Sequence, residues 1–132
     1  RLTLAKLMLS KINVLVLDEP AAGLDPKGRE DIFTGLDRYR KESGATVIIV
    51  SHSMEDMARY CDDVVVMGGA RVLMHGERKE IFSHTRELTE AGLDIPQITH
   101  LMRLLRERGV SVPENIYTVE DAVSAVRALF AD

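Results

Sequence analysis

Two short runs of apolar residues, separated by one amphipathic stretch, constrain the fold of this chain more than any other feature. Ile12–Leu17 and Thr46–Val50 are rich in Val, Ile and Leu, as are strands that are buried on both faces of a parallel sheet. Between them, Asp25 and Pro26 suit the N-cap and the first turn of a helix that we expect to end near Ser43. This order predicts a right-handed βαβ crossover.

The remainder of the chain predicts a hairpin and several helices. Ser53 and Asp56 have capping-box spacing and open a short helix. Gly68-Gly69 is a turn sequence between two expected strands. We place a domain boundary near Ser83, with an α/β portion before it (1–82) and a small helical extension after it (83–132). The expected strands are Val64–Met67 and Arg71–His75, and the expected helical segments are Arg1–Leu9, Glu77–Phe82, Arg86–Ala91, Gln97–Arg108 and Val119–Phe130.

Composition excludes several classes of protein. The 132 residues are 45% hydrophobic, which is too apolar for a disordered chain. The net charge is −4 and no basic block occurs, so we expect no nucleic-acid partner. Cys61 is the single cysteine, so no disulfide can form within the chain. The apolar runs are shorter than the roughly 20 residues that a spanning helix needs, and we expect no membrane span. The chain begins at Arg1 in the middle of a pattern, which indicates a fragment.

The chemistry-bearing residues follow the two apolar runs. Asp18 and Glu19 come directly after the first run, and His52 comes just after the second. Ligands of open parallel sheets bind outside the carboxyl ends of the strands, so Glu19 and His52 should face one crevice if the strands are neighbours. One carboxylate can support Mg²⁺ through water, and the next can orient or deprotonate an attacking water. The alternative is a strand that ends in solvated acids and a surface histidine.

The series LDEP, AAGLDP and VIIVSH, in this order, resembles the Walker B, D-loop and switch-histidine motifs of the ABC-type ATPases. The resemblance covers Arg1 to about Phe82. It implies an α/β fold that is part of a P-loop NTPase sheet, with crossover helices and a hairpin. It also implies that Asp18 acts on Mg²⁺, Glu19 is the catalytic base, Asp25 lies in the D-loop at an ATPase dimer contact, and His52 lies near the γ-phosphate of ATP.

The tail narrows the resemblance. GLDIPQIT and LRERGVSVPE are similar to the C-terminal extension of the energy-coupling-factor (ECF) ATPases, which power uptake of vitamins or of cobalt and nickel. The resemblance implies ATP and Mg²⁺ as ligands, and a second ATPase subunit and a membrane coupling protein as partners. It also implies a peripheral location on the cytoplasmic face of the membrane.

Two features depart from that pattern. The chain has neither a G-x-x-x-x-G-K-[ST] phosphate loop nor an LSGGQ-like signature, so it resembles only the C-terminal half of an ATPase and is expected to be inactive alone. RLTLAKLMLSKINVLVLDEP is more similar to the soluble ABC-F ATPases that act on ribosomes. Three hypotheses about the function of the chain therefore stay open. It is part of an ECF importer ATPase, part of a ribosome-directed ATPase, or a truncated or engineered module without catalysis.

Overall fold

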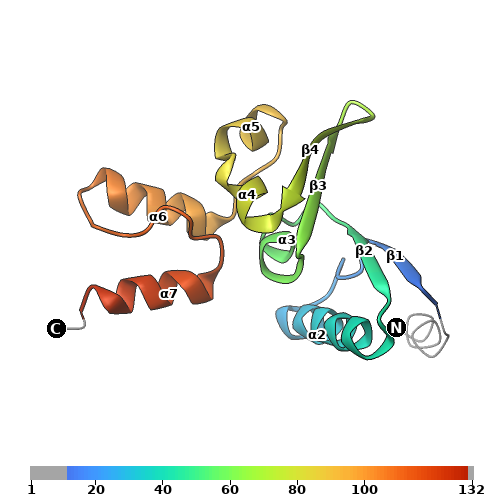
Figure 1. Cartoon of the computed structure of the whole chain (residues 1–132). Helices are drawn as coiled ribbons and strands as arrows, with labels where there is room; N and C mark the ends of the chain where they lie inside the picture. Colours follow the sequence, from blue (N-terminus) through green and yellow to red (C-terminus); the bar gives the residue numbers. More distant parts are fainter. Residues whose placement is uncertain (1–11, 131–132) are drawn as a thin grey trace. The chain divides into compact units, whose positions relative to one another are not determined.

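The computed structural model describes residues 12–130 (Figure 1). The chain divides between His52 and Ser53 into two compact units, which are described separately. The helix expected over Arg1–Leu9 lies outside the described residues. Among the described helices, none has the length and apolarity that crossing a membrane requires.

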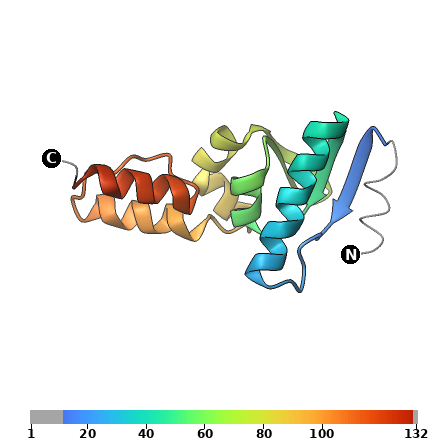
Figure 2. The same cartoon turned by 90° about the horizontal axis from the view of Figure 1, so that it is seen from below.

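The first unit is a βαβ arrangement. Strand β1 (Val14–Asp18) pairs in parallel with β2 (Thr46–Val50), and helix α2 (Pro26–Ser43) connects them. The register sets Val14 opposite Thr46 and Asp18 opposite Val50. Figure 2 shows α2 running beside the two strands. The predicted α/β class and the strand–helix–strand order are therefore confirmed.

Helix α2 begins and ends where its capping residues predict. The Asp25 side chain accepts a hydrogen bond from the Gly28 N–H, and Pro26 occupies the first helical position, where no N–H is needed. Gly44 ends the helix with φ 69°, a left-handed conformation that favours glycine. Phe33 and Leu36 form the buried face of the helix, at 2% and 3% exposure.

Only one face of the β1–β2 sheet is covered within the described residues. Leu15 is buried on the inner face, whereas Val16 is 61% exposed on the outer face. The prediction that both strands are buried on two faces is therefore wrong for this structure. The cause is that helix α2 covers one face, and the described residues of the unit hold no second layer. Besides Val16, the exposed apolar residues of the outer face are Val14, Ile48 and Val50.

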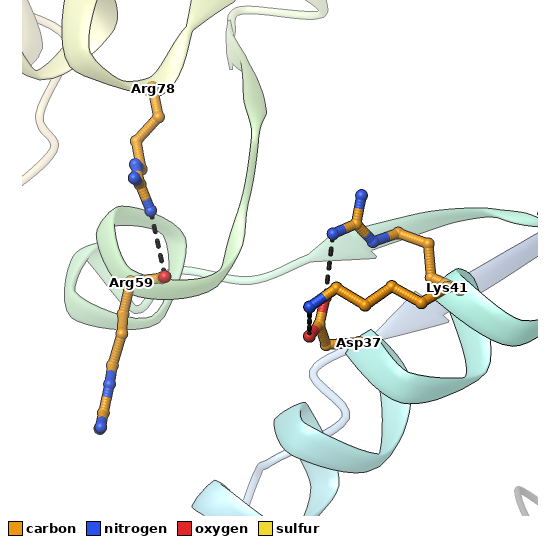
Figure 3. Close-up of polar contacts among 5 residues, drawn as sticks. Asp37, Lys41, Arg59 and Arg78 are labelled. Atoms are coloured by element: carbon orange, nitrogen blue, oxygen red, sulfur yellow. Dashed lines mark hydrogen bonds and ion pairs between the residues drawn. The ribbon is translucent and has the colours of Figure 1, made fainter.

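A carboxylate on α2, that of Asp37, binds two basic side chains of the same helix. Asp37 accepts hydrogen bonds from Lys41 Nζ at 2.6 Å and from Arg40 Nη2 at 2.9 Å (Figure 3). Both hydrogen bonds lower the pKa of the Asp37 carboxyl group, and the bond from Lys41 has the larger effect. Lys41 and Arg40 also lie in the last turn of the helix, where positive charge complements the carbonyl end.

The second unit starts with a helix and a hairpin. Helix α3 (Met54–Tyr60) is capped by Ser53, as predicted. Strands β3 (Asp63–Gly68) and β4 (Arg71–Glu77) pair antiparallel. The turn between them is Gly69-Ala70, with φ of 55° and 58°, so the predicted Gly68-Gly69 turn is wrong by one residue. Two consecutive positive φ values are those of a type I′ turn, whose twist matches that of the strands.

Short helices follow the hairpin. They are α4 (Arg78–Ser83) and α5 (Thr85–Glu90). Arg78 donates from Nη1 to the backbone carbonyl of Arg59, which ties the start of α4 to α3 (Figure 3). Phe82 lies against Tyr117 with ring centroids 5.9 Å apart, so residues on both sides of Ser83 pack together.

The chain then forms a helical hairpin from α6 (Gln97–Glu107) and α7 (Val119–Ala128). The buried Thr99 hydroxyl donates to the Ile116 carbonyl at 2.8 Å, which joins α6 to the segment before α7. The core of the hairpin consists of Met102, Val112, Ile116 and Ala122. The helical extension is thus present, while the domain boundary near Ser83 stays a prediction.

Candidate functional site

The predicted residues gather at the carboxyl ends of β1 and β2. Asp18 is the last residue of β1 and Glu19 follows it, whereas Ser51 and His52 follow β2. Because the strands are parallel neighbours in register, these four residues share one edge of the sheet. That edge is where open parallel sheets bind ligands.

The backbone turns sharply at Glu19. Its φ is 45°, a left-handed value that costs a non-glycine residue about 1–2 kcal/mol. The Glu19 N–H still continues the ladder by donating to the Val50 carbonyl at 2.8 Å, and the Glu19 carbonyl accepts from the Ala22 N–H at 3.0 Å. A strained residue of this kind is typical of functional sites, where the surroundings hold it in place.

The side chain of Glu19 is anchored to the end of β2. Its Oε1 accepts from the backbone N–H of His52 at 2.9 Å and lies 2.6 Å from His52 Nδ1. Its Oε2 accepts from the Ser51 hydroxyl at 2.9 Å. The structure therefore joins the two predicted catalytic residues, Glu19 and His52, directly to each other.

The contact with Glu19 also determines which nitrogen of the His52 imidazole carries a proton. An ionised carboxylate only accepts hydrogen bonds, so His52 Nδ1 carries a proton. Nε2 then accepts a hydrogen bond when the ring is neutral and donates one when the ring is protonated. The His52 side chain is 89% exposed, so Nε2 can reach a ligand such as a phosphate or a water.

The same hydrogen bonds set the charge of Glu19. They lower the pKa of its carboxyl group, and the hydrogen bond from the His52 side chain has the largest effect. The Ser51 hydroxyl and the His52 N–H lower the pKa further, whereas desolvation raises it. Glu19 is thus ionised at neutral pH and can accept a proton. Its side chain keeps 34% exposure, so a water can approach it.

Asp18 suits a role toward Mg²⁺ but does not form a complete cation site. It is exposed at the end of β1. Over residues 12–130, no group of three or more His, Cys, Asp or Glu side chains could hold a metal ion. Mg²⁺ commonly uses one or two carboxylates and keeps several waters, with substrate phosphates completing its coordination. A single Asp18 carboxylate fits that pattern, in which water and phosphate oxygens supply the other ligands.

Asp25 has a structural task in this structure. Its Oδ1 accepts from the Gly28 N–H at 2.8 Å and caps α2. No hydrogen bond within the described part of the chain connects Asp25 to Glu19 or His52. The structure therefore does not bring Asp25 into the cluster of Asp18, Glu19 and His52, and its predicted place at a dimer contact stays a prediction.

Ser51 also contacts Glu19, although the sequence motifs do not predict it as a site residue. It precedes His52 in VIIVSH, at the end of a predicted strand beside the predicted base. The signal that could have found it is the register: if β1 and β2 pair with Asp18 opposite Val50, the next residues, Glu19 and Ser51, are opposite each other.

Comparisons with known proteins support these motifs. No family model matches the chain. It is 44% identical over 126 residues to the energy-coupling factor transporter ATP-binding protein EcfA2 of Clostridium perfringens, which is 96% of this chain and 44% of that protein. The solved structure of cbiO1 from Clostridium perfringens, part of the ABC transporter complex cbiONQ, matches 76% of this chain and 40% of its own, with 40% identity and a TM-score of 0.58.

A second solved structure, an ATP-binding cassette of an ABC transporter, matches 58% of this chain and 30% of its own. Its identity to this chain is 26% and its TM-score is 0.51. The fold is therefore that of part of an ABC ATPase domain, of the P-loop NTPase class. The chain spans less than half the length of the curated relative described above. Over the part of their length that it spans, the chain is therefore similar to ECF transporter ATP-binding proteins, with 42–46% identity over 92–98% of its own length.

Proposed function

We propose that this chain supplies the water-activating half of an ATPase site in an ECF-type importer. The observation that carries the proposal is the contact of Glu19, at the end of β1, with His52, at the end of β2. The relatives are ATP-binding subunits of ECF transporters, which favours the importer over a ribosome-directed ATPase.

In the proposed reaction, Glu19 orients a water and accepts its proton. The water oxygen bonds to the γ-phosphorus, and the bond from phosphorus to the β,γ-bridging oxygen breaks with its electron pair left on ADP. His52 fixes the Glu19 carboxylate through Nδ1 and presents Nε2 to the γ-phosphate. Asp18 would hold Mg²⁺ through water, and the bound ion would neutralise phosphate charge.

The proposal extends to the assembly. A second ATPase subunit would complete the ATPase, and Asp25 would approach it from the loop after β1. A membrane coupling protein would bind the pair at the cytoplasmic face and link hydrolysis to the uptake of a vitamin or of cobalt or nickel. The sequence lacks a phosphate loop, so we propose that these 132 residues alone do not turn over ATP.

The first experiment measures MgATP binding and hydrolysis by this chain and by a protein of its relatives' length that contains it, called here the natural-length protein. Each is compared with its Glu19→Gln variant as control. We expect no turnover by the chain, turnover by the natural-length protein, and its near loss in Glu19→Gln with ATP binding kept. Wild-type turnover in Glu19→Gln would rule out the base role. Hydrolysis by the chain alone would contradict its proposed inactivity.

A second experiment separates the two kinds of ATPase. The natural-length protein should co-purify with a membrane coupling protein rather than sediment with ribosomes. Sedimentation with ribosomes, without a membrane partner, would reject the importer.

A further inference from the structure

The hydroxyl of Ser51 is the donor that holds the second oxygen of the Glu19 carboxylate. His52 occupies Oε1 with two groups, its backbone N–H and Nδ1, whereas Ser51 Oγ donates to Oε2 at 2.9 Å. Each oxygen is thus held by a different residue of the β2 end. Tilting the plane of the carboxylate about the last bond of the Glu19 side chain would weaken both attachments.

Counting lone pairs shows which oxygen is open to a water. An ionised carboxylate has about four acceptor sites, two on each oxygen. Three of these sites are filled within the described part of the chain: two on Oε1 by His52 and one on Oε2 by Ser51. The remaining site lies on Oε2, beside the Ser51 hydroxyl.

The backbone around this contact is fixed. The Glu19 N–H donates to the Val50 carbonyl at 2.8 Å, one residue before Ser51, and the strands are in register up to Asp18 and Val50. The contact from Ser51 to Glu19 therefore bridges the ends of two paired strands rather than two mobile loops. A hydroxyl at position 51 consequently selects one orientation of the Glu19 carboxylate.

We propose that Ser51 is a positioning residue for ATP hydrolysis: its hydroxyl orients Glu19 so that the open site on Oε2 receives the proton of the attacking water. The inference rests on the proposed role of Glu19 as the base. The proton that leaves the water passes to Oε2 and later to solvent, while the new bond from the water oxygen to the γ-phosphorus forms. Ser51 itself gains and loses no proton.

The test is a kinetic comparison in the natural-length protein with its partners. Ser51→Ala removes the hydroxyl, and Ser51→Thr keeps one. Ser51→Ala should lower kcat about tenfold, the scale of one hydrogen bond to a charged group, and leave KM for MgATP within about twofold. Ser51→Thr should restore most of kcat. Ser124→Ala is the matched control, because this exposed serine donates only to the Glu120 carbonyl of its own helix.

A double variant separates positioning from general damage. Since Ser51 acts through Glu19, adding Ser51→Ala to Glu19→Gln should cause no further loss of kcat. Equal kcat in Ser51→Ala and wild type, failure of Thr to rescue, or a further loss in the double variant would each overturn the proposal. If Glu19→Gln itself keeps wild-type turnover, the proposed base role and this inference fall together. If only Ser51→Ala keeps it, the base role stands and the positioning role falls.

Discussion

Asp25 offers a direct test of the difference between a structural cap and a residue of the ATPase interface. In the structure its carboxylate caps α2 through the Gly28 N–H, at 2.8 Å. The first turn of α2 contains Lys27 and Arg29 and no acidic residue. Asp25 therefore supplies both the capping acceptor and the negative charge that favours a helix N-terminus.

The magnitude follows from these two contributions. Asp25→Ala removes the cap, which costs about 1 kcal/mol. It also removes the charge, which costs roughly a further 0.3–1 kcal/mol. Asp25→Asn keeps an acceptor oxygen and loses only the charge, so it should cost roughly 0.3–1 kcal/mol. We thus expect the free energy of unfolding to fall in the order wild type, Asn, Ala.

The assay is urea unfolding of the natural-length protein, followed by circular dichroism at fixed salt. Parallel measurement of MgATP turnover uses conditions in which all three proteins are folded. Equal stability of Asp25→Ala and wild type would refute the capping argument. Equal losses in the Asn and Ala variants would show that charge alone matters. If folded Asp25→Asn loses turnover although its stability falls only slightly, the result would support the interface role that the resemblance implies.

Other positions give predictions of both signs. Gly35→Ala should stabilise α2 by roughly 0.5–1 kcal/mol, because an added Cβ in this helix interior meets nothing within 4 Å. Gly44→Ala should destabilise α2 by roughly 1–2 kcal/mol, because the φ of Gly44 is 69°. Urea unfolding measures both changes. Thr99→Val should cost roughly 1–3 kcal/mol and raise amide exchange in α6, since it leaves the buried Ile116 carbonyl without its donor. The lowered pKa of Asp37 contributes stability that is present at neutral pH and is lost as pH falls through that pKa; Asp37→Asn should reduce the acid-side slope of stability against pH.

The fold could be predicted where neighbouring residues determine it. The predicted start of α2 at Asp25-Pro26 and its predicted end near Ser43 are both confirmed, because capping depends on residues close to the helix ends. The Gly68-Gly69 pair predicts the hairpin turn one residue too early, because the two positive φ values are at Gly69 and Ala70. The covering of the sheet could not be predicted, because a continuous apolar run does not reveal whether one layer or two will pack on it.

The candidate site could be predicted in its members but not in its geometry. The sequence places Asp18, Glu19 and His52 after apolar runs, and parallel pairing then brings them to one edge. It does not predict a left-handed backbone at Glu19, because the strain becomes stable only through contacts across 32 or 33 positions of sequence. The residue that those contacts add, Ser51, is ordinary in the sequence and is identified only through its partner.

The site therefore depends on strand register as much as on motif. The side chains of a strand alternate between faces, so a slip of one residue would send each side chain of β2 to the opposite face. It would also move Ser51 away from Glu19, although every motif residue would be unchanged. Val47 and Ile49, on the half-buried face of β2, resist such a slip, because it would expose them. The apolar residues of β2 thus hold the Glu19 carboxylate in place, because they fix the register that puts Ser51 and His52 beside it.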